Sequence, residues 1–198
     1  MRIIAGKFRG RRLVSFKADH IRPTTDRVKE SVFNKLQGDW DGAKVLDLFA
    51  GTGNIGFEAI SRGAVSVTAV EMSGKSIDII RRNVEELGVG RDEHRIVKDD
   101  VLKWLARYDG AAFDIVMADP PFTESLAHAT LELLAKSTAV GPATTVVVEA
   151  SSHERVDETY ENLVCWDRRD YGDKQISFWM RPRPSDEGIG HAEEGAPE

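Results

Sequence analysis

The residues Asp119-Pro120-Pro121-Phe122 follow an apolar run, Phe113–Ala118, that predicts a buried strand. The two prolines fix the backbone and lack N–H donors, so this segment is stiff and presents carbonyl oxygens. A planar amine fits it, because Asp119 and the Pro120 carbonyl can each accept one N–H while Phe122 offers a stacking face. A turn that merely ends the strand is the alternative for an isolated X-Pro-Pro sequence.

A second motif lies upstream, between an expected strand at 44–48 and an expected helix at 55–62. Its Gly51-x-Gly53-x-x-Gly56 spacing matches the fingerprint of dinucleotide-binding folds, in which glycines let the backbone approach a ligand closely. Glu71 ends the next expected strand, where its carboxylate can accept hydrogen bonds from both hydroxyls of a ribose. Together these residues predict a cofactor that contains a ribose.

Asp47 helps to identify that cofactor. A carboxylate four residues before Gly51 repels a pyrophosphate but attracts a cation. S-adenosylmethionine carries a sulfonium and an ammonium group and has no phosphate, so we expect it rather than NAD. After the expected strand at 94–98, Asp99 or Asp100 can accept a hydrogen bond from the adenine amino group or can cap the following helix.

These motifs resemble those of class I S-adenosylmethionine-dependent methyltransferases that act on amino groups. The segments Arg2–Leu13 and Arg22–Asn34 closely resemble the bacterial 16S rRNA (guanine-N2)-methyltransferase family called RsmD, over about residues 1–181. The resemblance implies methyl transfer to the exocyclic N2 of one guanine, guanine 966 of 16S rRNA in the usual numbering. It also implies 16S rRNA as the partner, within the 30S subunit or an assembly intermediate.

The expected site residues fall into three groups. Those that recognise the amine and catalyse transfer are Asp119, Pro120, Pro121 and Phe122. The expected cofactor-binding residues are Asp47, Phe49, Gly51, Thr52, Gly53, Glu71, Asp100 and Val101. The expected RNA-binding residues are Arg9, Arg11, Arg12, Arg22, Thr24, Thr25 and Arg27. For the last four of these, an exposed helix start is the alternative. The five histidines lack metal-ligand spacing, so no metal is expected.

Charge is distributed unevenly along the chain. The net charge of the 198 residues is −6, yet residues 1–35 hold ten Lys or Arg against three acids, a balance of +7 that leaves −13 for the rest. This asymmetry, with Phe8 and Phe16 interleaved among the bases, predicts a local surface for RNA phosphates. A solvated basic segment without a partner is the alternative.

Strands and helices alternate from residue 44 onward, which predicts an α/β fold with a mostly parallel sheet covered on both faces. Further strands are expected at 65–71, 144–149, 162–169 and 175–181, and further helices at 73–87, 101–107 and 123–139. The family resemblance implies a Rossmann-like, seven-stranded methyltransferase sheet whose last two strands form an antiparallel hairpin. We expect a basic N-terminal hairpin and helix at 1–40, the methyltransferase domain at 41–183 and a disordered acidic tail at 184–198.

The amino-acid composition indicates the class of protein and the compartment in which it is expected. A 41% apolar content fits an ordinary globular core, Cys165 is the single cysteine, and no apolar run approaches membrane-spanning length. We therefore expect a soluble cytoplasmic protein that is monomeric and does not bind membranes. Three other functions remain open: amino-methylation of DNA adenine or cytosine, other RNA or a protein glutamine; an NAD-dependent dehydrogenase; and a cofactor-binding module without catalysis.

Overall fold

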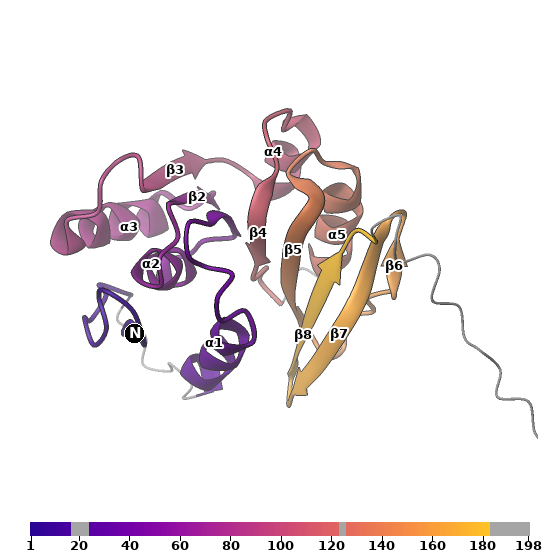
Figure 1. Cartoon of the computed structure of the whole chain (residues 1–198), viewed down its shortest axis with the longest axis horizontal. Helices are drawn as coiled ribbons and strands as arrows, with labels where there is room; N and C mark the ends of the chain where they lie inside the picture. Colours follow the sequence, from indigo (N-terminus) through magenta and orange to yellow (C-terminus); the bar gives the residue numbers. More distant parts are fainter. Residues whose placement is uncertain (17–23, 123–125, 183–198) are drawn as a thin grey trace, which may run out of the picture.

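The computed structural model describes residues 1–16, 24–122 and 126–182, with the backbone alone for residues 24–27. The described chain forms one mixed sheet in the strand order β3-β2-β1-β4-β5-β8-β7-β6 (Figure 1). The five strands from β3 to β5 are parallel, and β8 runs antiparallel between β5 and β7. The strand order reverses at β1, so the carboxyl ends of β1 and β4 form the topological switch point at which open α/β sheets bind ligands.

The expected alternation of strands and helices is confirmed. The strands are β1 (Lys44–Leu48), β2 (Ser66–Glu71), β3 (His94–Lys98), β4 (Phe113–Ala118), β5 (Val140–Ser151), β6 (Thr159–Tyr160), β7 (Leu163–Tyr171) and β8 (Lys174–Met180). The helices are α1 (Thr24–Lys35), α2 (Asn54–Ser61), α3 (Gly74–Leu87), α4 (Val101–Arg107) and α5 (Leu126–Lys136).

Two groups of helices cover opposite faces of the sheet (Figure 1). Helices α1, α2 and α3 pack on one face, where Val32, Phe57 and Ile80 join strand residues such as Met117 and Val147 in one buried cluster. Helices α4 and α5 pack on the other face against the alternate strand positions. This period-two alternation within β4 and β5 produces two apolar layers because successive strand side chains point to opposite faces.

Two details differ from the expected strand pattern. Seven strands match the expected pattern, and the two-residue β6 adds a short pair, Thr159 with Val164 and Tyr160 with Leu163, at the edge. Strand β5 begins at Val140 rather than at 144. Its first residues include Pro142, and they tolerate the missing N–H because the β4–β5 register shifts at this end.

The N-terminal arm, defined here as residues 1–16, folds back on itself as expected for a hairpin. Ile3 donates its backbone N–H to the Arg11 carbonyl at 3.0 Å, and Leu13 donates to the Met1 carbonyl at 3.1 Å. Ile3 and Leu13 are buried in the cluster that also contains residues of α1, α2 and α3. The arm is therefore packed onto the body of the protein.

Glu58 of α2 is the principal polar anchor of this arm. Its carboxylate is fully buried and accepts backbone N–H bonds from Ile4 at 2.8 Å and from Ala5 at 3.1 Å. It also pairs with Lys29 of α1 at 3.4 Å and with Arg62 at 2.9 Å. Four donors thus satisfy a charge that would otherwise be costly to bury.

Asn83 of α3 connects the arm to the glycine loop. Its side-chain oxygen accepts from the Val14 N–H at 2.7 Å, and its amide donates to the carbonyls of Val14 at 3.0 Å and Thr52 at 3.3 Å. Asn83 is almost completely buried. These bonds fix the Thr52 backbone against the arm.

Replacing Glu58 by Ala should lower the free energy of unfolding by about 3 kcal/mol, because it removes the counter-charge of the buried Lys29 and the acceptor of two backbone N–H groups. Urea unfolding followed by circular dichroism measures this change. The matched control is Glu132→Ala, which removes an exposed carboxylate of α5. A loss no larger than that of the control would contradict the anchoring role.

Candidate active site

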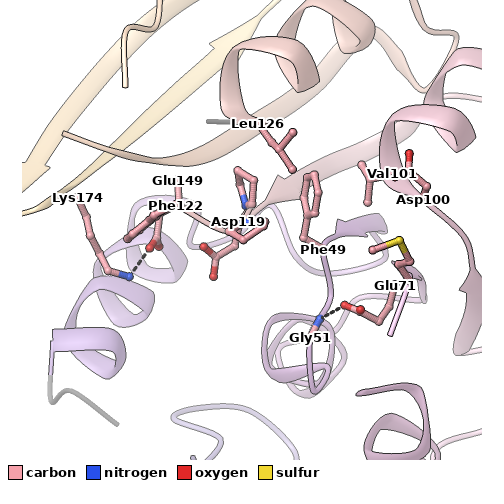
Figure 2. A pocket seen from close by; sticks show the side chains of 13 residues that line it. Phe49, Gly51, Glu71, Asp100, Val101, Asp119, Phe122, Leu126, Glu149 and Lys174 are labelled. Carbon is pink, nitrogen blue, oxygen red and sulfur yellow. Dashed lines mark hydrogen bonds and ion pairs between the residues drawn. The ribbon is translucent and has the colours of Figure 1, made fainter. Parts of the chain in front are cut away.

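A cavity of about 530 Å³ opens at the carboxyl ends of the parallel strands. Figure 2 shows its two sides, with Phe49 between them: Gly51, Glu71, Asp100 and Val101 on one side, and Asp119, Phe122, Glu149 and Lys174 on the other. The two motifs recognised in the sequence therefore face a single cavity. We refer to the first side as the glycine-loop side and to the second as the Asp119 side.

The Asp119 side begins directly after β4. The Asp119 N–H donates to the Leu48 carbonyl at 3.4 Å, which ties this segment to the end of β1. Pro120, Pro121 and Phe122 also line the cavity, as expected. Because Pro120 and Pro121 have no N–H, the segment offers carbonyl oxygens and one carboxylate to a ligand.

Asp119 is enclosed on most sides, although one part of it is open to the cavity. The pKa of Asp119 is raised from 3.8 to about 7, mainly by burial and also by the negative charge of Glu149, while the charge of Lys174 acts to lower it. The carboxyl group also borders a small second cavity of about 60 Å³, lined by Val32 and Ile55 among others. Asp119 can therefore exchange a proton near neutral pH.

On the glycine-loop side, Glu71 organises the backbone. One of its oxygens accepts the Gly51 N–H at 2.8 Å, and the other accepts the Ser73 N–H at 2.7 Å. Gly51 has φ 54° and Gly53 has φ 81°, both in the left-handed region that favours glycine. A carboxylate has about four acceptor sites, so Glu71 retains acceptor capacity for hydroxyl groups.

Phe49 lies between the two sides and has a strained backbone. Its φ of 59° is in the left-handed region, which aromatic residues rarely adopt. Asp100 and Val101 complete the glycine-loop side. Asp100 lines the cavity and also caps α4 by accepting the Lys103 N–H at 2.9 Å, whereas Asp99 forms an ion pair with Arg107.

Three of the expected cofactor-binding residues do not line the cavity. Thr52 and Gly53 are buried in the loop, and Gly53 is the N-cap of α2. Asp47 is 1% exposed and lies beneath α2, where one oxygen accepts the Gly56 N–H at 3.1 Å and the other has no hydrogen-bond partner. These three residues form the buried layer beneath the glycine loop rather than the cavity wall, and the cofactor-binding role of the loop stays a prediction.

Four cavity residues were not predicted from the sequence: Met72, Leu126, Glu149 and Lys174. Glu149 and Lys174 form an ion pair, and the Lys174 ammonium lies 4.9 Å from the centre of the Phe122 ring. They stand in β5 and β8, and Glu149 lies 27 residues after Phe122 in the sequence. Neither stands in a motif, so only the pairing of β5 with β8 brings them to the site.

The expected RNA-binding residues are only partly described. Arg9, Arg11 and Arg12 are exposed on the arm, away from the cavity wall, and Arg11 donates to the Glu86 carbonyl at 2.8 Å. Arg22 lies outside the described residues, as do the side chains of Thr24, Thr25 and Arg27 and the acidic tail at 184–198. The RNA-binding role of this set stays a prediction.

The described ranges 1–16, 24–122 and 126–182 lack two further features. No group of three or more His, Cys, Asp or Glu side chains in these ranges could hold a metal ion. No helix there is long and apolar enough to cross a membrane.

The buried Asp47 predicts an unusual pH dependence of stability. Its pKa is raised from 3.8 to about 7, mainly by burial and also by the charges of Asp119 and Glu71, while the Gly56 N–H acts to lower it. The unfolded chain thus releases this proton near pH 4, whereas the folded protein retains it to about pH 7. The contribution of Asp47 to stability therefore falls as pH rises through this window and is constant above it.

Asp47→Asn removes this effect, so it should raise the free energy of unfolding more at pH 8 than at pH 5, by about 2–3 kcal/mol. Urea unfolding at the two pH values measures the difference. The control is Asp78→Asn, which changes an exposed carboxylate. An equal gain at pH 5 and pH 8 would show that Asp47 is not neutral in the folded protein at low pH.

Comparison with known proteins places the chain in a family. The family model described as "Conserved hypothetical protein 95" matches residues 1–180. The ribosomal RNA small subunit methyltransferase D of Haemophilus influenzae is 36% identical over 150 residues, which are 75% of this chain and 78% of that protein. The protein of the same name from Escherichia coli K12 is 40% identical over 134 residues, 68% of this chain and 66% of that protein.

A solved structure agrees with the fold. The Escherichia coli protein yhhF superimposes with a TM-score of 0.81 at 32% identity, covering 91% of this chain and 97% of that one. The similarity therefore extends over most of both chains. The chain belongs to the RsmD family of methyltransferases, the family described as "Conserved hypothetical protein 95".

Proposed function

We propose that this protein transfers a methyl group from S-adenosylmethionine to the exocyclic N2 of a guanine in 16S rRNA, with guanine 966 as the position implied by family resemblance. The names of the relatives support ribosomal RNA of the small subunit as the substrate class. We further propose that the substrate RNA is presented within the 30S subunit or an assembly intermediate.

One observation carries this proposal. A glycine loop suited to a ribose-bearing cofactor and a rigid Asp-Pro-Pro-Phe segment suited to a planar amine line opposite sides of one cavity, with Phe49 between them. Methyl transfer needs its donor and acceptor in contact and aligned, and a shared cavity supplies that proximity. A cofactor-binding module would not need the Asp119 side.

The residues present fit S-adenosylmethionine. Glu71 retains acceptor capacity for ribose hydroxyls beside the Gly51 N–H. Asp47 has an unpartnered buried oxygen, and its pKa is raised in part by the charges of Asp119 and Glu71. This concentration of carboxyl groups favours a cationic ligand over a pyrophosphate. When bound, the cofactor would supply an electrophilic methyl group on a sulfonium.

Asp119 and Pro120 then act on the amine. The Asp119 carboxylate and the Pro120 carbonyl accept the two hydrogens of the amine. This directs the nitrogen lone pair away from the Asp119 side of the cavity and out of conjugation with the ring. The negative charge of Asp119 stabilises the positive charge that develops on the nitrogen. With a pKa of about 7, the same carboxylate can accept the proton that the methylated nitrogen releases.

The deciding experiment measures transfer of labelled methyl from S-adenosylmethionine to unmodified 30S subunits, free 16S rRNA, tRNA and duplex DNA. We expect label in one guanine of 16S rRNA or 30S subunits. Asp119→Ala should retain cofactor binding by calorimetry but lose about 10²–10³ in rate, because it removes the acceptor nearest the amine. The control Asp78→Ala changes an exposed residue of α3 and should be fully active.

Other outcomes have clear meanings. Label found only in DNA or tRNA would support amine methylation but would exclude 16S rRNA as the substrate. Cofactor binding without any labelled acceptor would contradict the proposal in favour of a binding module. Normal turnover by Asp119→Ala would exclude the mechanism.

The exposed arginines of the arm should set the salt dependence of RNA binding. If Arg9 and Arg12 each contact one phosphate, replacing both by Ala should weaken binding and reduce the slope of log affinity against log salt by about 1.4. Filter binding of 16S rRNA over a range of KCl concentrations measures this slope. The double control Arg81→Ala and Arg155→Ala removes two other exposed arginines, and an equal reduction there would refute a specific role for the arm.

A further inference from the structure

The pairing of three strands places Glu149 and Lys174 beside Asp119. Ala118 of β4 pairs with Val148 of β5, so the next positions along the two parallel strands, Asp119 and Glu149, are neighbours on the same face. Glu149 in turn pairs with Ile176 of the antiparallel β8, and Lys174 lies two residues before Ile176, again on that face. Three charged side chains therefore converge at one end of the cavity.

Their contacts hold them as a row. Lys174 pairs with Glu149, and both side chains are largely enclosed, at 16% and 14% exposed. Glu149 also lies close enough to Asp119 for its negative charge to raise the pKa of that carboxyl group. The Lys174 ammonium rests against the Phe122 ring, which fixes its position relative to the stacking surface. The cavity wall thus presents acceptor, acceptor and donor groups in sequence beside an aromatic ring.

This order has one complement among the bases that carry an amine. The Watson–Crick edge of guanine presents the N2 amine and the N1–H as adjacent donors and then O6 as an acceptor. Adenine and cytosine instead place a ring-nitrogen acceptor next to their amine, and its lone pair would face the second carboxylate. Mismatched hydrogen-bonding groups in a largely enclosed site strongly disfavour the wrong ligand.

We propose that Glu149 and Lys174 select guanine as the acceptor base: Asp119 accepts from the N2 amine, Glu149 accepts from N1–H, and Lys174 donates to O6. This inference rests on the proposed function and assigns its base specificity to two residues outside the Asp-Pro-Pro-Phe motif. A base that binds this row gives Glu149 and Lys174 each a hydrogen-bond partner on the ring beside their own ion pair. The alternative is that the ion pair only fastens β8 to β5.

The test compares guanine with 2-aminopurine at the methylated position of 16S rRNA, introduced by ligation and assembled into 30S particles. 2-Aminopurine keeps the amine at C2 but has an acceptor at N1 and no O6. Single-turnover rates at saturating S-adenosylmethionine are measured for the unaltered protein and for Glu149→Gln. The preference of each protein is its rate with guanine divided by its rate with 2-aminopurine. The ratio of the preferences of the unaltered protein and Glu149→Gln does not depend on the intrinsic difference in reactivity between the two bases.

Glu149→Gln should reduce the preference for guanine by about 10- to 100-fold, because the glutamine amide can donate to the N1 acceptor of 2-aminopurine. Lys174→Met should slow transfer to guanine more than transfer to 2-aminopurine, which has no O6 to bind. The control Glu132→Gln, on the exposed side of α5, should leave the preference unchanged.

The outcomes separate the two levels of inference. A parallel fall of both rates in Glu149→Gln, with an unchanged preference, would overturn base selection and leave Glu149 as a structural residue. Full activity of Glu149→Gln on both bases with an unchanged preference would overturn it as well. No transfer to guanine by the unaltered protein would overturn the proposed function itself.

Discussion

Burial of carboxyl groups at one edge of the sheet is the constraint around which this site is built. Parallel strands end at the same edge, so β1, β2 and β4 bring Asp47, Glu71 and Asp119 together there. Desolvation and repulsion raise the pKa of both Asp47 and Asp119 to about 7. Backbone N–H groups from the glycine loop and α2 and the nearby ammonium of Lys174 offset part of this cost. A cationic ligand at this edge would offset more of it.

The two recognised motifs were predictable because their geometry is local. A strand, a tight turn and a helix start depend on neighbouring residues, so Gly51, Glu71 and Asp119 could be assigned to one site from their positions at strand ends. Burial was harder to anticipate. Asp47 has the residue type expected for a cofactor contact, yet α2 covers it, and that covering depends on how a helix packs rather than on the motif.

Glu149 and Lys174 could not be found in this way, because their place in the site depends on long-range pairing. A glutamate within an apolar strand and a lysine next to a hairpin turn are common features, and neither indicates a function alone. The insertion of β8 between β5 and β7 turns them into neighbours of Asp119. The early start of β5 has a similar origin, since the register shift against β4 accommodates Pro142. The placement of Glu149 and Lys174 and the start of β5 therefore both depend on pairing between strands that are distant in the sequence.

The Asn83 amide has a thermodynamic consequence for the whole molecule. One side chain bonds to Val14 in the arm and to Thr52 in the glycine loop, so the order of the loop and the order of the arm are not independent variables. Linkage requires that a ligand which stabilises one of them stabilises the other by the same coupling free energy. If a ligand at the loop strengthens binding at the arm through Asn83, then a ligand at the arm must strengthen binding at the loop by the same factor.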